Sequence, residues 1–224
     1  MSGSYFEQFN VVRLFGLTNS AIMMIFVIFV GLLFLKGVDL IPKRWQSFFE
    51  LVYFHFYYVA KENLGVKGLK FFPFIFSLFF FLVFLKVFGL CPYVFTPTTH
   101  IIVTLGFSFS IIIGVTFAGL WRFKKDFFSI LMPSGAPLVL APLLVLIETV
   151  SYFSRAISLG VRLAANLSAG HLLFAILASF GVVFKLAILI MIFITLLEIA
   201  VAIIQAYVFC LLTTIYLADT LVLH

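Results

Sequence analysis

Long apolar segments alternate with short polar segments along this chain, and the polar interruptions define the predicted elements. Apolar residues occupy positions 21–35, 69–90 and 101–121 almost without a break. An apolar helix of about 20 residues matches the hydrocarbon thickness of a bilayer. We therefore expect each of these three segments to cross a membrane once, as an upright helix.

Residues 42–62 follow a different pattern. Charged residues such as Lys43 and Glu50 alternate with aromatic residues such as Phe49 and Tyr53 at helical spacing. This pattern is typical of an amphipathic helix that lies in the membrane interface.

The last two apolar segments, residues 138–177 and 182–223, are too long for an upright crossing. A helix of about 40 residues is ~60 Å long, twice the ~30 Å of the hydrocarbon core, and strong tilt accommodates the excess. We expect a hairpin of two long, strongly tilted, antiparallel helices. The predicted fold is an all-α polytopic membrane protein in one membrane domain, with the N-terminal helices and loops in residues 1–137 and the hairpin in residues 138–224.

The composition supports a membrane protein and excludes several other classes. Hydrophobic residues make up 65% of the chain and charged residues 10%, which leaves too little polar surface for a water-soluble domain. The net charge of +6 is spread over loops, without the basic and aromatic pattern of a nucleic-acid-binding protein. Cys91 and Cys210 have no metal-ligand spacing. We expect contact with membrane lipid, and no nucleic acid, metal or cofactor.

Basic residues predict the orientation, because they concentrate on the inner side of a membrane. On the predicted outer side of the membrane, the only flanking basic residues are Arg13 and Lys185. The basic residues after the first and third predicted crossings are Lys36, Lys43, Arg44, Lys61, Lys67, Lys70, Arg122, Lys124 and Lys125. We therefore expect the N-terminus to face outward and the C-terminal His224 to face inward.

Arg162 lies inside the apolar segment 138–177. Arginine at the centre of a membrane helix costs about 2.5–3.5 kcal/mol on insertion scales, and such residues face a bundle interior or a water-filled ion pathway. The guanidinium does not deprotonate, so it can hold an electric field but cannot carry a proton. We therefore expect Arg162 to act as a fixed charge beside an ion path.

The polar residues around Arg162 are sorted to two sides of its predicted helix. Glu148, Arg155 and Arg162 are spaced by seven positions. Asn166 follows Arg162 by four, so these residues share one stripe. His171 comes nine positions after Arg162, which is about half a turn away from that stripe.

The returning helix carries a second polar face. Glu198 and Gln205 are seven positions apart and share it. With the turn near residues 181–183, the antiparallel register puts Arg162 opposite the region around Gln205. The same register puts His171 close to Glu198.

Two polar sets result, one on each side of Arg162. His171 with Glu198 lies toward the outer side, and Glu148 with Ser151 lies toward the inner side. Histidine and carboxyl groups can relay protons, whereas a fixed cation between them repels a proton that would leak straight through. The pattern predicts a proton path with an electrostatic gate.

A partner must complete this path, because no carboxylate of this chain is mobile enough to pass Arg162. We expect the partner to supply a carboxylate on a helix that approaches closely. Small residues allow such an approach, and those near the gate are Gly160, Ala164, Ala165, Ala169 and Gly170.

The chain resembles the subunit a family of F-type ATP synthases, in its mitochondrial form. The resemblance covers roughly residues 45–224. It rests on GLCPY at 89–93 with FT at 95–96, PSGAP at 133–137, LGVRLAAN at 159–166 with AGH at 169–171, and LE at 197–198 with QAYVF at 205–209.

The resemblance implies a stator subunit of the membrane sector Fo, which is not itself catalytic in ATP chemistry. Such a subunit forms two offset aqueous half-channels and conducts protons to and from a rotating ring of c subunits, which couples the proton gradient to ATP synthesis. The implied partners are this c-ring, the peripheral stalk and other Fo membrane subunits. The implied location is the mitochondrial inner membrane, with a bacterial plasma membrane as the alternative.

The resemblance also implies roles for individual residues. Arg162 corresponds to the arginine that faces the ring carboxylate, with Asn166 and Gln205 as its polar neighbours. The outer half-channel residues are His171 and Glu198, and the matrix-side residues are Glu148 and Ser151. The sequence departs from the family pattern at Lys86, where Asn is common, and at Asp126, where His is common.

Four further polar residues have open roles. His100 either lines the outer path or is a hydrogen-bonded loop histidine. Arg155 either pairs with Glu148, reaches lipid headgroups or belongs to the path. Tyr207 and Asp219 lie toward the inner end of the last helix, where Asp219 is either an interfacial anchor or a channel group.

Two rival classes of function fit the sequence less well. A secondary transporter or simple proton channel remains the alternative, but the chain lacks the internal repeat and the paired broken helices of many transporters. A haem or quinone electron-transfer subunit needs paired axial histidines inside helices. Only His171 is clearly within a predicted crossing.

Overall fold

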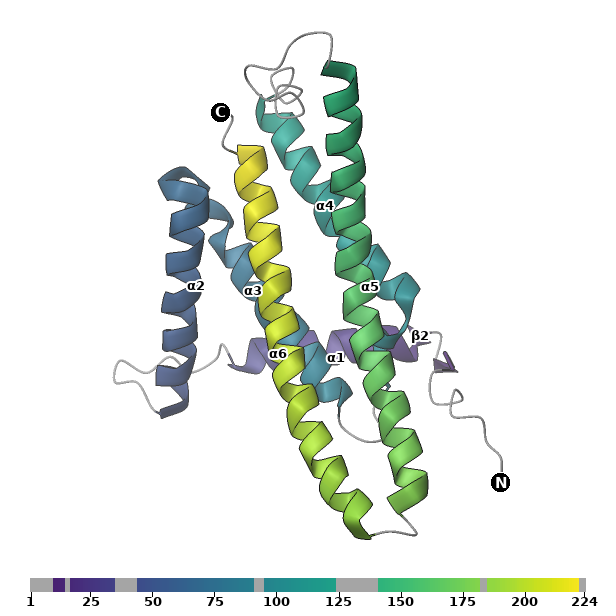
Figure 1. Ribbon diagram of the computed structural model, residues 1–224. Helices are drawn as coiled ribbons and strands as arrows, with labels where there is room; N and C mark the ends of the chain where they lie inside the picture. The colour runs from purple at the N-terminus through teal and green to yellow at the C-terminus, as the bar shows by residue number, and fades with distance from the viewer. Residues whose placement is uncertain are drawn as a thin grey trace. The chain divides into compact units, whose positions relative to one another are not determined.

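The computed structural model of this chain describes residues 10–14, 17–34, 44–90, 95–123, 141–181 and 185–221. Two short strands, β1 (Arg13–Leu14) and β2 (Leu17–Thr18), pair antiparallel before the first helix. The helices that follow are α1 (Asn19–Phe34), α2 (Arg44–Gly68), η2 (Leu69–Phe71), α3 (Phe72–Gly89), η3 (Pro97–Thr99), α4 (Ile101–Phe123), α5 (Ala141–Gly181) and α6 (Lys185–Leu221) (Figure 1). The predicted all-α class is confirmed. Cys91, Asp126 and the segment 133–137 lie outside the described residues.

Among the described residues, three helical segments are long and apolar enough to cross a membrane, which confirms the predicted polytopic class. They are Leu69–Gly89, Pro142–Ser179 and Leu189–Thr220. Shorter apolar segments lie in α1 (Asn19–Gly31) and in α4 (Ile101–Phe117). Crossings by α1 and α4, an interfacial α2 and strong tilt of α5 and α6 stay predictions.

Helix α2 continues beyond the predicted segment 42–62, to Gly68. The helical run is interrupted at Gly65, whose φ of 63° and ψ of −176° are not helical. Glycine adopts positive φ without the steric cost of a Cβ. The residues after this break lead into η2 and α3, so Gly65 redirects the chain before the second apolar segment.

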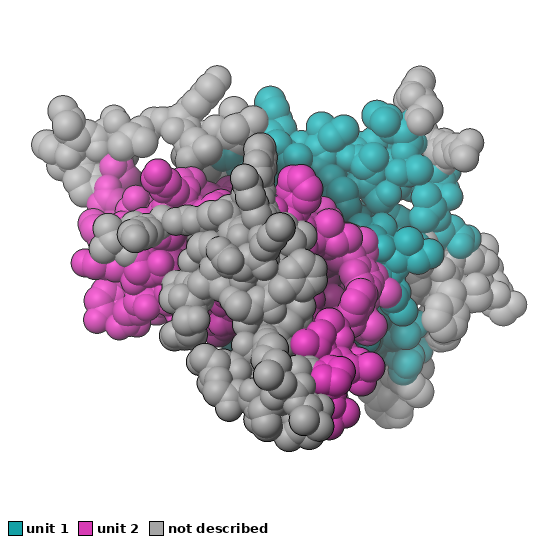
Figure 2. Space-filling view, turned by 90° about the horizontal axis from the view of Figure 1, so that it is seen from above, with its two compact units in different colours: residues 1–38, 78–104, 161–208 teal, residues 39–77, 105–160, 209–224 magenta. Residues whose placement is uncertain are grey.

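The chain forms two compact units, coloured separately in Figure 2. Unit 1 comprises residues 1–38, 78–104 and 161–208, and unit 2 comprises residues 39–77, 105–160 and 209–224. Each unit combines segments from both parts, 1–137 and 138–224, of the predicted single domain.

Unit 1 contains the second half of α5 and the first half of α6, which run antiparallel (Figure 1). The end of α3 reaches α6 through Lys86 and lies near Leu167 of α5 at Gly89, and α1 contacts η3. Phe26 of α1 meets Phe88 of α3 edge to face, with ring centroids 5.7 Å apart. Val27, Leu82 and Ala164 are buried in this unit.

Unit 2 is held by aromatic contacts and by one close approach of helices. Tyr53 of α2 lies edge to face with Phe72 of α3, with ring centroids 5.0 Å apart. At Gly160 of α5, an added Cβ would lie 3.0 Å from the Cα of Leu105 and 3.1 Å from the Oγ of Ser108 on α4. Such distances are shorter than ordinary van der Waals contact, so glycine allows α4 and α5 to pack closely.

This close approach predicts a stability effect. Gly160→Ala should lower the free energy of unfolding by about 1–3 kcal/mol, because the new methyl group forces the backbone of α4 away. Gly106→Ala is the matched control, since nothing lies within 4 Å of its added Cβ. Thermal unfolding of the purified protein in detergent measures both variants. Equal melting temperatures for the two would contradict the described packing.

Candidate functional site

The side-chain amide of Gln205 joins three helices of unit 1. The Lys86 Nζ on α3 donates a hydrogen bond to the Gln205 Oε1 on α6. The Gln205 Nε2 in turn donates to the backbone carbonyl of Arg162 on α5, over 3.4 Å. Lys86 is 1% exposed and Gln205 is 7% exposed. Because polar groups buried among apolar helices must find partners within the protein, this link holds the three helices together.

The contacts between α5 and α6 agree with the register expected from the sequence. Gln205 reaches Arg162, as described above. Two turns earlier on α6, the Glu198 side chain lies against Gly170, and an added Cβ there would collide with its carboxylate. The absence of a side chain at Gly170 thus lets Glu198 reach α5 directly beside His171.

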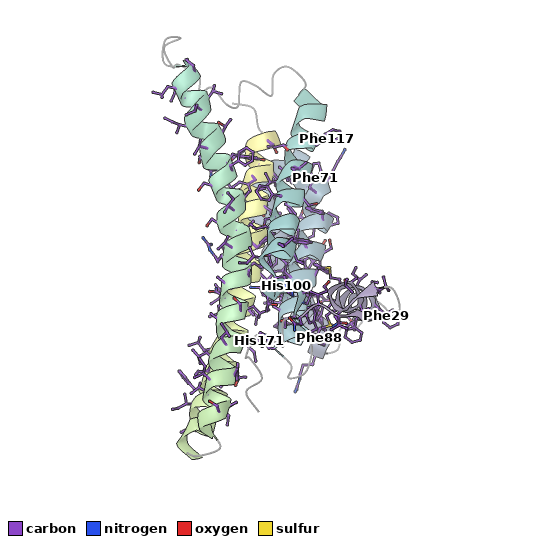
Figure 3. The ribbon with its side chains drawn as sticks, turned by 90° about the vertical axis from the view of Figure 1, so that its right-hand side faces the viewer. Phe29, Phe71, Phe88, His100, Phe117 and His171 are labelled. Carbon is purple, nitrogen blue, oxygen red and sulfur yellow. The ribbon has the colours of Figure 1, made fainter. Side chains whose placement is uncertain are left out.

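His171 lies where α3 ends. Its half-buried imidazole is hydrogen-bonded to the backbone of Gly89. Figure 3 shows His171 at the level of Phe88, the residue before Gly89. An added Cβ at Gly89 would lie 2.7 Å from the Thr96 Cγ2 and 3.7 Å from a methyl of Leu167. The missing side chain at Gly89 therefore leaves room for Thr96 beside the end of α3.

The carboxylate of Glu198 lacks hydrogen bonds at this site, within the described part of the chain. Both carboxylate oxygens are buried and have no hydrogen-bond partner among the residues that the structure describes. A buried carboxyl group without a partner is costly, and such groups are rare in a protein interior. This cost argues for a chemical role of Glu198 and against a role in holding the helices together.

The backbone and the side chain of Arg162 have different surroundings. The backbone carbonyl accepts the bond from Gln205, whereas the side chain is exposed. Asn166, one turn later on the same stripe, is exposed as well. The described residues provide no ion-pair partner for the guanidinium. Within the described part of the chain, the charge is therefore exposed and has no opposite charge beside it.

The small residues near Arg162, which we expected to let a partner helix approach, do not form one exposed surface. Gly160 and Ala164 are buried, and Gly160 faces α4 of the same chain. Gly170 faces Glu198. Only Ala165 and Ala169 of this set are exposed. Most of these small residues serve packing within the chain, because close helix contacts inside a membrane protein also require them.

Unit 2 contains a second polar cluster, which is formed by residues of α5 and α6. The guanidinium carbon of Arg155 lies 5.7 Å from the ring centroid of Tyr216, which is a cation–π contact. The rings of Tyr152 and Tyr216 lie 6.3 Å apart. The buried Tyr152 hydroxyl also interacts electrostatically with Asp219. Arg155 and Asp219, two of the residues with open roles, thus belong to one cluster, and Ser151 lies half-buried beside it in sequence.

The remaining predicted residues are His100, Tyr207 and Glu148. His100 stacks on Phe95, with ring centroids 5.6 Å apart, and its Nε2 has no hydrogen-bond partner within the described part of the chain. Tyr207 is half-buried in α6. The backbone of Glu148 lies in α5, but its side chain is not among those described.

Two of these polar residues, Lys86 and Tyr152, had no predicted role. Lys86 was noted only as a departure from a family pattern. Its signal is its charge, since it is an ionisable residue within the apolar helical segment Leu69–Gly89, and ionisable residues within such segments are rare and usually functional. Tyr152 gives no comparable signal, because tyrosine is common in helices of this kind.

Comparisons with known proteins identify one family. The family model described as ATP synthase A chain matches residues 17–218. A protein of Metridium senile named ATP synthase subunit a is 65% identical over 232 residues, covering 100% of both chains. Proteins with the same name from Marchantia polymorpha and Mycosarcoma maydis are 43% and 42% identical, covering 100% and 97% of this chain and 100% and 96% of their own lengths.

The contact between Gly170 and Glu198 can be tested by a double-mutant cycle. Gly170→Ala should lower the melting temperature of the purified protein by several degrees, about the effect of a 1–3 kcal/mol overpacking. In a Glu198→Ala background the same substitution should cost much less, because the carboxylate it displaces is gone. Equal losses in both backgrounds would show that the two residues do not touch.

Proposed function

The chain belongs to the ATP synthase A chain family, and we propose that it forms two offset half-channels that carry protons to and from a rotating c-ring. Membership makes it a proton-translocating subunit of the Fo sector, with the c-ring and other Fo subunits as its partners. Its mitochondrial-type relatives and its apolar helices make it a protein of the mitochondrial inner membrane. The observation that carries the proposal is the exposed guanidinium of Arg162, which has no ion-pair partner among the described residues.

The outer half-channel runs past His171 and Glu198. Both are titratable, and the Glu198 carboxylate reaches α5 beside His171 through the space that Gly170 leaves. Its oxygens are buried without partners among the described residues, which suits a group that gains and loses a proton. Protons that enter here are passed to a carboxylate of the ring.

The inner half-channel runs past Glu148 and Ser151 on the earlier part of α5. Arg155 and Asp219 contribute to the electrostatics of the same cluster, through Tyr152 and Tyr216. Protons leave the ring on this side, toward the matrix. The N-terminus faces the intermembrane space and the C-terminus faces the matrix in this arrangement.

Arg162 separates the two half-channels. Its permanent positive charge repels a proton that would pass directly from one to the other. The same charge favours the ionised form of a ring carboxylate beside it, which makes the carboxylate release its proton. Asn166 on the same exposed stripe lines this contact. Each proton must therefore travel with the ring almost fully round, and rotation is coupled to the proton gradient.

Other subunits complete the assembly. The exposed face of α2 carries large apolar residues, including Leu51 and Phe54, that suit lipid or a neighbouring membrane subunit. The peripheral stalk holds the stator against the turning ring. ATP chemistry itself takes place elsewhere in the enzyme.

Removing the gate charge should abolish coupling. In the assembled enzyme, Arg162→Ala should abolish proton-driven ATP synthesis, because protons then pass the interface without turning the ring. Arg44→Ala is the control, since Arg44 is exposed at the start of α2 and distant in sequence from the hairpin. ATP synthesis by inverted membrane vesicles energised with a proton gradient measures both variants. Normal coupling in Arg162→Ala would rule out the gate and favour a simple transporter or channel.

Changing a relay residue should slow transport without preventing assembly. His171→Leu removes a titratable group from the outer half-channel, where general acid and base groups of this kind contribute about 10²–10⁴-fold in rate. The passive proton flux of the membrane sector should fall, while the amount of assembled enzyme stays close to normal. His55→Leu on the exposed side of α2 should leave the flux unchanged. An unaltered flux in the His171→Leu variant would remove this residue from the path.

A further inference from the structure

We propose that Lys86 is a positioning residue that holds Arg162 at a fixed height on α5, acting through the amide of Gln205. This inference rests on the proposed role of Arg162 as the gate. The three residues form one continuous chain of hydrogen bonds, from the Lys86 amine to the Gln205 amide and from there to the Arg162 backbone. All three lie in unit 1.

The chemistry of the two bonds allows only one orientation of the Gln205 amide. The amine of Lys86 acts as a donor, so it requires the oxygen of the amide. The backbone carbonyl of Arg162 can only accept, so it requires the amide nitrogen. Reversing the amide would put donor against donor and acceptor against acceptor. Lys86 therefore selects the orientation in which Gln205 can bind α5.

The burial of Lys86 makes this link hard to replace. Its side chain is 1% exposed, in the last turn of α3. Without Lys86, the oxygen of Gln205 would lose its donor inside the protein, where no bulk water can substitute. Leaving one member of a buried hydrogen-bonded pair unsatisfied costs more than the bond itself contributes. The structure thus ties the position of α6 to a residue of α3.

The bond to α5 is made at the residue that carries the gate charge. A mid-helix carbonyl already accepts the bond of its own helix, and its second lone pair accepts from Gln205. The link consequently sets the height of the Arg162 backbone against α3 and α6. The guanidinium must meet a ring carboxylate that passes at one level, and a misplacement of about 1 Å in a reacting geometry can cost about 100-fold in rate.

A direct role of Lys86 in carrying protons is the competing explanation. The contact of its amine in this structure is with a neutral amide, not with the carboxylate of Glu198 or the ring of His171. A positioning role requires only an N–H donor at this place, whether charged or neutral. A proton-carrying role requires a titratable group. The two explanations therefore differ in what they predict for a neutral donor.

The test compares two substitutions in the assembled enzyme. Lys86→Met keeps a long, flexible side chain without a donor, and should lower proton-driven ATP synthesis about tenfold, the effect of losing one strong buried hydrogen bond. Lys86→Gln keeps N–H donors on a neutral side chain and should restore most of the activity. Lys70→Met is the matched control, because Lys70 is exposed in η2. The content of this subunit in the purified enzyme is measured for every variant.

A double-mutant cycle identifies the route of the effect. Gln205→Leu already breaks the link to α5, so adding Lys86→Met should cause little further loss. Additive losses would show that Lys86 acts independently of Gln205 and would overturn the proposal. If Lys86→Met is not incorporated, the comparison is made with Lys86→Gln, alone and combined with Gln205→Leu. Low activity of an assembled Lys86→Gln variant would equally overturn the positioning role.

Failure of this inference is distinguishable from failure of the proposed function. Full activity of Lys86→Met, with activity abolished in Arg162→Ala, would refute the positioning role and leave the gate intact. Full activity of Arg162→Ala would refute the gate itself.

Discussion

The Gln205 amide accepts a hydrogen bond from Lys86 and donates one to the backbone of Arg162, and the arrangement of unit 1 follows from these two bonds. Inside a bilayer there is no water to satisfy a polar group, so each must find a partner in the protein. One amide meets this requirement for three helices at once. With α3, α5 and α6 joined at this level, Glu198 comes to lie against Gly170 and His171 meets the end of α3.

The backbone and the side chain of Arg162 differ in the same respect, because only the backbone is bonded within the described part of the protein. The backbone of this residue is held by the protein, while its charged side chain remains exposed. In our proposal this charge interacts with one moving carboxylate after another, so a permanent ion pair within its own subunit cannot neutralise it. The Arg162 side chain does need a rigid support. The buried amide of Gln205 provides one and, being neutral, does not compete with the ring carboxylate for the guanidinium. In our proposal the stator thus combines a fixed backbone with an available cation.

Much of this organisation could be predicted from the sequence, because apolar length and helical spacing are local properties. The two long C-terminal helices were predicted within a few residues of α5 and α6. Placing the turn near residues 181–183 also put Arg162 opposite Gln205, as observed. The stripe through Arg162 and Asn166 is exposed, and Leu163 and Leu167 beside it are buried.

Other features could not be predicted, because they depend on contacts between segments far apart in the chain. Lys86 and Gln205 are 119 positions apart, and no periodicity relates α3 to α6. Gly160 was expected to be available to a partner but packs against α4, since spacing alone does not say which neighbour a small residue faces.

The most direct test of the central claim is the passive proton flux of the membrane sector after the ring has been covalently locked to the stator. We predict no flux while Arg162 is present, because protons can cross only on a turning ring, and a substantial flux through the locked wild-type sector would contradict the gate.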